Sequence, residues 1–502
     1  MRGESYAVNK GREMMSRSAH MFLSKKKQVA GMAVGAIAML AMAVPALTEE
    51  DDAEAIKKDE VFKVTTAIHV DGSSALVSFD ISWVDPVRKR YYLAERSNNQ
   101  IDVVNTSDNS ITHIAQGLFA GVVLNPDGTA NNDKSGPDGV LTVHRGEDED
   151  EGGVTELWVG DSPGKVWVLN ALTGANILGD KNFISVGGTT RADELCFDSK
   201  DHLIMIASPG EGDGTTSAGP FVTFISTKTH KVVANGRLVF DGTNGTVQAT
   251  GGLEQCGWSR KTGKFYQNVP VAGKGPSGVI AVIDPETVLA GHPKVMTNLP
   301  VADNDCDLPQ GMAIGPDDQI MLGCNGPSLG GNGLRNTAMV NINTGATLPG
   351  GFFANLGGVD EVWFNKGDGH YFFPSCNTAC RAGTGSEVLG IVDTRGPRLD
   401  QTVVLATTLG TTATSRGRRA HSVAADPDTL QVYVPLPACV SSGGMCVTGA
   451  NDASNCANAP TKVGSPTAVT GCILVLKGTP DADDRVARKG ENDQGENDNS
   501  QH

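Results

Sequence analysis

The sequence has few aromatic residues, an excess of negative over positive charge, and no long apolar run in its body. Phe, Trp and Tyr make up only 5% of its 502 residues, so Val, Ile, Leu and Ala must form most of the core. The formal charge of −16 disfavours nucleic acid or an anionic membrane surface as a partner, because phosphate groups repel such a protein. With 39% apolar and 20% charged residues, the chain is still typical of a folded protein.

Several motifs that carry chemistry are also missing. The sequence contains no H-E-x-x-H helix, no Walker-type phosphate loop and no strand-linked dinucleotide fingerprint. It contains no C-x-x-C either, so neither a redox motif nor covalent haem is supported. Glycine is abundant at 62 residues but shows no G-X-Y period, which excludes collagen.

The N-terminal segment has the order of a secretory signal. Lys25, Lys26 and Lys27 precede an apolar run over residues 29–44, and small residues follow for cleavage. This run is shorter than the ~20 residues that a membrane-spanning helix needs. We therefore predict a signal peptide over residues 1–46, a periplasmic or secreted protein, and no stable membrane insertion after cleavage. An uncleaved anchor is the alternative.

Composition divides the rest of the chain into three parts. Residues 47–60 form an acidic linker, and residues 479–502 lack large apolar side chains, which predicts a disordered tail. Residues 61–478 are the predicted folded body.

All ten cysteines lie after the signal, and in an exported protein this even number predicts disulfides. Cys306 and Cys324 flank one predicted hairpin, and Cys376 and Cys380 could close a small loop. The last four are expected to pair among themselves; they are Cys439, Cys446, Cys456 and Cys472.

A short β-branched strand that ends in a polar residue occurs seven times. The copies are Ile101–Asn105, Val166–Asn170, Val222–Ser226, Ile280–Asp284, Thr337–Asn341, Leu389–Asp393 and Ile473–Lys477. Before each copy lies an apolar strand, a polar turn and another apolar strand, as in Leu195–Ala207. Two hairpin strands, the repeated strand and a returning fourth strand make one blade of a β-propeller.

The two ends of the folded body fit this arrangement. The seventh copy stands almost at its end, so the last blade lacks a fourth strand there. The β-rich segment Val61–Val70 precedes the first hairpin and can supply that strand, which hides both edges of the array. The sequence thus predicts an all-β fold, a seven-bladed β-propeller closed by an N-terminal strand that completes the last blade. A repeated sandwich array is the alternative.

The strand-turn-strand phrases resemble those of YVTN and NHL-type propellers and of the senescence-marker/gluconolactonase-like group. The resemblance covers most of residues 61–478 and is carried by short blade phrases, so it speaks for the fold more than for an activity.

When the hairpins are aligned on their turns, two columns of residues stand just ahead of the innermost strands. The first column is Asp80, Gly139, Asp193, Glu254, Gln310, Asp360 and His421. The second is Ile81, Val140, Glu194, Gln255, Gly311, Glu361 and Ser422. Innermost strands line the axial channel of a propeller and begin at one mouth, so these residues should converge. The predicted ligand-binding residues are Asp193, Glu194, Gln310, Glu361 and His421.

Carboxylates gathered so closely repel one another unless a cation lies between them. Asp193, Glu254, Asp360 and His421 are the predicted ligands of a divalent metal, which could be Ca²⁺, Mg²⁺, Mn²⁺ or Zn²⁺. Such a metal could polarise a carbonyl or activate water, with Glu254 and Asp360 as the candidate catalytic residues. The alternative is structural: these residues cap turns or brace neighbouring blades.

The resemblance to the gluconolactonase-like group implies a divalent metal in the axial channel and the hydrolysis of lactones. Glu254 is the best match to the acidic ligand of that group. The Asn ligands of the group have no counterpart in the two columns.

A second cation site is conceivable at Asn131–Asp138, where oxygen-bearing side chains alternate as at the start of a calcium loop. Thr142 stands where the closing glutamate would be, so a solvated hairpin tip is the preferred interpretation.

Two functions therefore compete. The first is an exported propeller that binds a small-molecule ligand or an envelope protein through its axial mouth. The second is a metal-dependent, lactonase-like hydrolase that uses the axial carboxylates.

Overall fold

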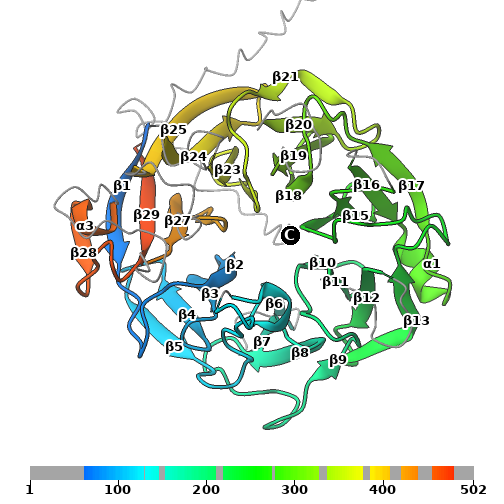
Figure 1. Ribbon diagram of the computed structural model, residues 1–502, viewed down its shortest axis with the longest axis horizontal. Coiled ribbons are helices and arrows are strands. Elements are labelled where there is room, and N and C mark those ends of the chain that lie inside the picture. The colour runs from blue at the N-terminus through cyan, green and yellow to red at the C-terminus, as the bar shows by residue number, and fades with distance from the viewer. Residues whose placement is uncertain are drawn as a thin grey trace, which may run out of the picture. The chain divides into compact units, whose positions relative to one another are not determined.

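Seven small antiparallel sheets stand in a ring in the computed structural model (Figure 1). The structure describes residues 61–128, 130–145, 153–210, 219–273, 278–326, 336–376, 385–407, 420–438 and 455–479. The predicted signal peptide, the acidic linker and nearly all of the tail lie outside the described residues. In the described part, no helix has the length and apolarity needed to cross a membrane. The prediction of an all-β, seven-bladed propeller is confirmed.

Six blades have four strands each, ordered from the axis outward. Blade 1 contains β2 (Phe79–Asp85), β3 (Arg90–Glu95), β4 (Gln100–Asn105) and β5 (Ile111–Ile114). Blade 2 contains β6 (Val140–His144), β7 (Thr155–Asp161), β8 (Lys165–Asn170) and β9 (Ile184–Ser185). Blade 3 contains β10 (Leu195–Asp198), β11 (Leu203–Ser208), β12 (Phe221–Ser226) and β13 (Lys231–Val239).

The next three blades follow the same order. Blade 4 contains β14 (Cys256–Ser259), β15 (Lys264–Val269), β16 (Val279–Ile283) and β17 (Val295–Pro300). Blade 5 contains β18 (Pro309–Ile314), β19 (Gln319–Cys324), β20 (Thr337–Asn341) and β21 (Thr347–Phe353). Blade 6 contains β22 (Trp363–Asn365), β23 (His370–Ser375), β24 (Ser386–Asp393) and β25 (Arg398–Thr407). All seven repeated phrases of the sequence are third strands of their blades.

Blade 7 joins the two ends of the folded body. Its strand order is β26 (Ala424–Asp426), β27 (Gln431–Leu436), β29 (Cys472–Thr479), β1 (Val61–Ile68) and β28 (Thr461–Val463). β1 pairs antiparallel with β29, from Val61 opposite Thr479 to Ile68 opposite Ile473. This confirms the predicted closure. The parallel strand β28 on the outer edge was not predicted.

Three short helices interrupt the strands of the described part. They are η1 (Asn132–Lys134), α1 (Pro285–Leu289) and α3 (Asn455–Asn458). The start of α1 has a clear local cause, because the Asp284 side chain accepts a hydrogen bond from the Glu286 amide and Pro285 occupies the first turn. The sequence pattern predicted only a turn after the strand at this position.

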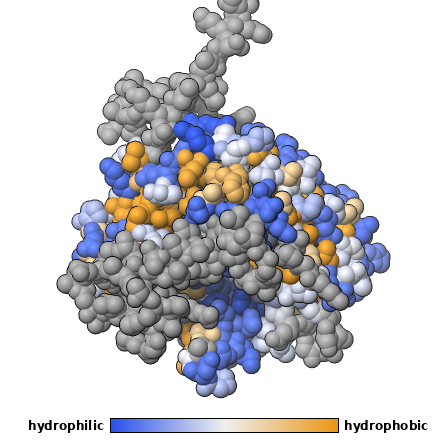
Figure 2. All heavy atoms as spheres, turned by 45° about the horizontal axis from the view of Figure 1, so that its top comes forward, coloured by the Kyte–Doolittle hydropathy of each residue, from blue (hydrophilic) through white to orange (hydrophobic). Residues whose placement is uncertain are grey.

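The apolar core lies between adjacent blades. One buried cluster packs blade 7 against blades 1 and 6, and in it the rings of Tyr91 and Tyr433 stack with centroids 4.9 Å apart. The outermost strands face solvent, and their burial patterns contain several exposed positions. Figure 2 shows hydrophilic surface with scattered hydrophobic patches on one face. The fold nevertheless buries a number of charged residues, and several of them lie at the axial channel.

Three disulfides are described. Cys306–Cys324 and Cys456–Cys472 agree with the predicted groupings. Cys196–Cys256 was not predicted; it ties β10 to β14, the innermost strands of neighbouring blades. Cys376 is also disulfide-bonded. The other predicted pairing partners, Cys380, Cys439 and Cys446, lie outside the described residues.

The closing strand offers a direct test of ring closure. Phe62 is only 1% exposed and packs edge-on against Phe372 of blade 6, with ring centroids 5.2 Å apart. Removing a buried Phe ring costs about 3–5 kcal/mol, so Phe62→Ala should lower the free energy of unfolding by that order. The measurement is urea unfolding followed by circular dichroism. Val61→Ala is the matched control, because Val61 is 44% exposed on the same strand. Equal effects of both substitutions would show that the packing of Phe62 against blade 6 does not stabilise the closed ring.

Candidate functional site

The two sequence columns converge on one cavity of about 460 Å³ at the mouth where the innermost strands begin. It is lined by every polar residue that the sequence predicts for binding, metal coordination or catalysis. These are Asp193, Glu194, Glu254, Gln310, Asp360, Glu361 and His421, and Asp80 joins them. They come from six different blades, so only ring closure brings them together. We refer to this space as the acidic chamber.

One position in the first column carries no side chain, and the structure explains why. Gly139 stands where other blades present an acid. A Cβ atom built there would lie 2.0 Å from the Asp193 carbonyl oxygen of the next blade. Only glycine permits this close approach of the two backbones.

Two arginines that were not predicted from the sequence also line the acidic chamber. Arg96 directly follows β3 and is 4% exposed. It donates to Asp80, and its Nε lies 3.1 Å from Oδ1 of the fully buried Asp138. Arg191 donates from Nε to Asp193 Oδ2 at 2.7 Å. The sequence contains only weak indications of these ion pairs. Asp138 directly precedes the first column, and Arg191 lies two residues before Asp193.

These contacts revise the interpretation of Asn131–Asp138. A solvated hairpin tip is wrong for Asp138, because this residue is buried and paired with Arg96. Asp133 of the same segment lies 3.2 Å from Arg191. The segment therefore reaches the acidic chamber and contributes counterions to its arginines.

Two sets of three acidic or histidine side chains in the described part of the chain have ligand atoms within 4.8 Å of one another. The first is Asp80, Asp138 and Asp193, where Arg96 and Arg191 already supply the positive charge. The second is His370, Asp393 and Asp400 in blade 6, where Arg395 and Arg398 pair with the carboxylates.

The predicted metal ligands share the acidic chamber but do not form a set of this kind. Asp193 belongs to the first set, whereas Glu254, Asp360 and His421 belong to neither. A metal held by these four residues stays a prediction, and it requires side chains to move toward a common point.

Several chamber residues also brace the ring, as the structural alternative expected. The His421 ring stacks on Phe79 at 4.6 Å, and its Nε2 lies 3.2 Å from the Phe79 carbonyl oxygen. Gln310 Nε2 donates to Glu254 Oε1 at 3.1 Å. These contacts join blade 7 to blade 1 and blade 5 to blade 4. They position the side chains without filling the chamber.

Polar residues of the second column link the blades next to the acidic chamber. Gln255 Oε1 accepts a hydrogen bond from the Val362 amide at 3.1 Å, which links blade 4 to blade 6. Ser422 donates to Glu361 Oε2 at 3.0 Å and contacts Ser82 at 2.9 Å. These contacts tie the innermost strands together next to the acidic chamber.

Burial dominates the electrostatics of the three glutamates in the chamber. It raises the pKa of Glu254 well above its usual range, and the charges of Asp360 and Asp193 raise it further. Burial raises the pKa of Glu361 in the same way, and so do Asp80 and Asp360. Glu194 follows this pattern, and the charge of Glu361 is the largest contribution after burial. Burial and the neighbouring carboxylates therefore favour the protonated form of all three glutamates.

The aspartates next to the arginines behave differently. Burial favours the neutral form of Asp80, but Arg96 and a hydrogen bond from His421 outweigh it and hold its pKa well below the usual range. Burial raises the pKa of Asp193 to about 6, even though Arg191 opposes the shift. The chamber thus combines an aspartate whose ionised form is favoured with glutamates whose protonated form is favoured.

No family model matches the chain, and no curated protein matches it. Among solved structures, a chain from "Crystal Structure of Mitotic Checkpoint Complex" is 13% identical with a TM-score of 0.45, and the match covers 89% of this chain and all of that one. A chain from "Kuenenia stuttgartiensis Hydrazine Synthase" is 14% identical with the same score, covering 72% of this chain and 94% of that one. Likenesses this distant carry no argument about function, and the sheets themselves establish the fold.

The raised pKa values predict how a glutamine substitution changes stability with pH. An unfolded glutamate titrates near pH 4.3, so above that pH the folded wild type must keep a proton that the unfolded chain releases. This disfavours folding increasingly as pH rises toward the folded pKa. Glu254→Gln removes that cost, worth about 1.4 kcal/mol for each unit of pKa shift.

We expect the melting temperature of Glu254→Gln to match or exceed that of the wild type at pH 8, with a smaller difference at pH 5. Scanning calorimetry over this pH range measures it. Glu286→Gln, in the first turn of α1 and away from the chamber, is the control. A difference that grows toward low pH would show that Glu254 is ionised in the folded protein.

Proposed function

We propose that this protein is exported and that its acidic chamber binds a small, positively charged ligand, of which a divalent metal ion is the simplest. The observation that carries the proposal is the excess of acidic over basic side chains in a cavity large enough to hold a ligand. Six carboxyl groups line the chamber, but only two guanidinium groups of the described residues do so. The signal-like N-terminus and the disulfides support export.

The raised pKa values of the three glutamates suggest how such a ligand would bind. A cation that enters the chamber supplies the positive charge that Glu194, Glu254 and Glu361 lack, so their ionised forms become favourable. Binding therefore displaces protons. Asp80, whose ionised form is favoured, selects for cations over anions. Arg96 and Arg191 already balance part of the negative charge, so a ligand with a small positive charge is sufficient.

The chamber should bind a cation more tightly as pH rises. For each proton displaced, the affinity should increase about tenfold per pH unit below the pKa of the group. Isothermal titration calorimetry with CaCl₂, MgCl₂, MnCl₂, ZnCl₂ and putrescine, in two buffers of different ionisation enthalpy, gives both the affinity and the protons released. Glu254→Gln should weaken binding at least tenfold, and Glu286→Gln should leave it unchanged. Absence of a binding heat and of any melting shift with all five probes would contradict the proposal.

A metal-dependent hydrolase is the second candidate. The observation that favours it is the pairing of Glu254 with Asp360, whose charge is the largest electrostatic contribution raising the pKa of Glu254. A carboxyl whose protonated form is favoured, as in Glu254, can serve as a general acid. The bound cation would supply the Lewis acid for a lactone carbonyl.

Hydrolysis of dihydrocoumarin, a simple lactone, separates the two candidates. If the chamber is catalytic, the metal-loaded wild type should hydrolyse it, and Glu254→Gln and Asp360→Asn should each lower kcat at least 100-fold. Cation binding without turnover above the rate of Glu254→Gln would leave ligand binding as the function.

A further inference from the structure

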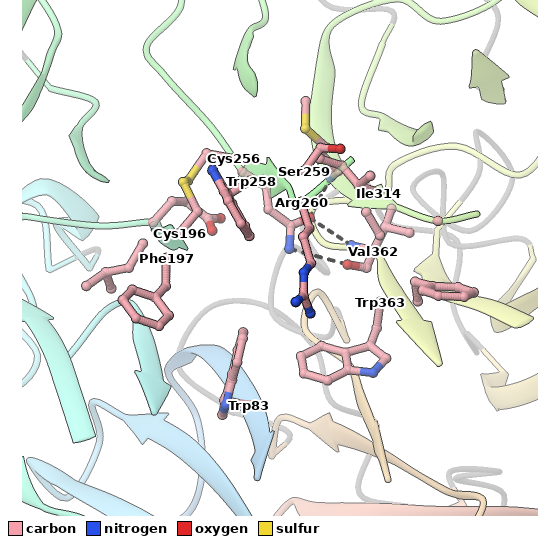
Figure 3. A pocket seen from close by; sticks show the side chains of 18 of the residues that line it. Trp83, Cys196, Phe197, Cys256, Trp258, Ser259, Arg260, Ile314, Val362 and Trp363 are labelled. Atoms are coloured by element: carbon pink, nitrogen blue, oxygen red, sulfur yellow. Dashed lines mark hydrogen bonds between the residues drawn. A yellow bond between two sulfur atoms is a disulfide. The ribbon is translucent and has the colours of Figure 1, made fainter. Parts of the chain in front are cut away.

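The other end of the axial channel holds a second cavity of about 230 Å³ with an opposite character (Figure 3). Its walls come from the innermost strands along their length and from the turns after β14 and β18, whereas the acidic chamber is lined mainly by residues at or before the starts of these strands. Glu194 is the one described residue that lines both cavities. The other described lining residues differ, so the two cavities can hold different ligands. We call this second space the aromatic pocket.

Tryptophan is scarce in this chain, yet three of its five copies meet at the aromatic pocket. Trp83 comes from β2, Trp258 from β14 and Trp363 from β22. The rings of Trp83 and Trp363 meet edge to face, with centroids 5.2 Å apart. Phe197 adds a further ring from β10, and Figure 3 shows these side chains around a common space. A concentration of aromatic surface in a concave site is typical of ligand pockets.

The pocket is held in shape by its surroundings. The disulfide Cys196–Cys256 forms part of the wall and locks two adjacent innermost strands together. The Trp83 Nε1 group donates to Thr142 Oγ1 of the next blade at 3.0 Å, which fixes the plane of this ring. A preformed pocket binds with a lower entropic cost than one that must be ordered.

Two basic residues line the pocket, together with the acidic Glu194 and Asp317. Arg260 directly follows β14, and Figure 3 shows its guanidinium group extending toward the rings of Trp83 and Trp363. Lys261 also lines the pocket, where it pairs with Asp318 at 2.9 Å. A guanidinium group has five donors, so it can bind a carboxylate while it keeps other contacts. The pocket therefore combines flat apolar walls with a donor suited to a planar anion.

We propose that the aromatic pocket binds a small planar aromatic carboxylate, with the ring against the tryptophans and the carboxylate on Arg260. The volume agrees with this class of ligand, since a cavity of about 150 Å³ accommodates benzene. An aromatic cation would use the same rings through cation–π contacts, but Arg260 and Lys261 repel it. This proposal is independent of the cation that we propose for the acidic chamber.

Benzoate, benzyl alcohol and benzylamine test the proposal because they share a ring and differ in charge. Binding is measured by isothermal titration calorimetry and by the change in tryptophan fluorescence. Benzoate should bind at least tenfold more tightly than the other two. Arg260→Gln should remove that preference while binding of benzyl alcohol persists, and Trp363→Leu should weaken all binding at least tenfold. Arg398→Gln, an exposed arginine of β25, is the matched control.

The proposal is overturned if benzoate shows no saturable binding, if benzylamine binds best, or if Arg260→Gln retains the preference for benzoate. Circular dichroism and the melting temperature verify that each variant is folded. Arg260→Gln retains all the tryptophans, so it tests the anion contact even if Trp363→Leu is unstable. Unchanged benzoate binding by Glu254→Gln would separate this pocket from the acidic chamber.

Discussion

The pairing of β1 with β29 is the constraint on which the rest of this structure depends. It joins segments at opposite ends of the folded body, for example Val61 and Thr479. The pairing hides the free edges of blade 7 and buries Phe62 against blade 6. Because the ring is closed, all seven innermost strands begin at one mouth of the axial channel. The acidic chamber is a consequence of that geometry rather than of any local motif.

Closure of the ring also brings six acidic side chains close together, and two effects reduce the repulsion between them. Near blades 1 to 3, Arg96 and Arg191 neutralise Asp80, Asp138 and Asp193 by direct ion pairs. For Glu254 and Glu361, burial outweighs the other effects and favours the protonated form, although the charge of Arg191 opposes it at Glu254. Replacement of such a proton by a cation is the basis of the binding that we propose for the chamber.

Polar contacts link the innermost strands of several blades at the axis. Gln255 reaches from blade 4 to blade 6, and Ser422 joins Glu361 to Ser82 across blades 6, 7 and 1. These contacts stabilise the ring from within, and the innermost strands line both an acidic and an aromatic cavity. Propellers host many unrelated functions, so the chemistry of these two ends, rather than the fold, carries the functional proposals.

The sequence by itself determined the strand pattern, the seven repeats, the closure and the identity of the acidic residues that line the chamber. Each of these follows from local alternation of apolar residues or from a fixed position relative to a turn, and both are visible along the chain. Only the tertiary structure decided which charges pair. Arg96 meets Asp138 of the next blade, and Cys196 meets Cys256 across 60 residues, because side-chain reach between blades has no period in the sequence. The aromatic pocket could not be predicted for the same reason: Trp83, Trp258 and Trp363 look like isolated core residues until the ring brings them together.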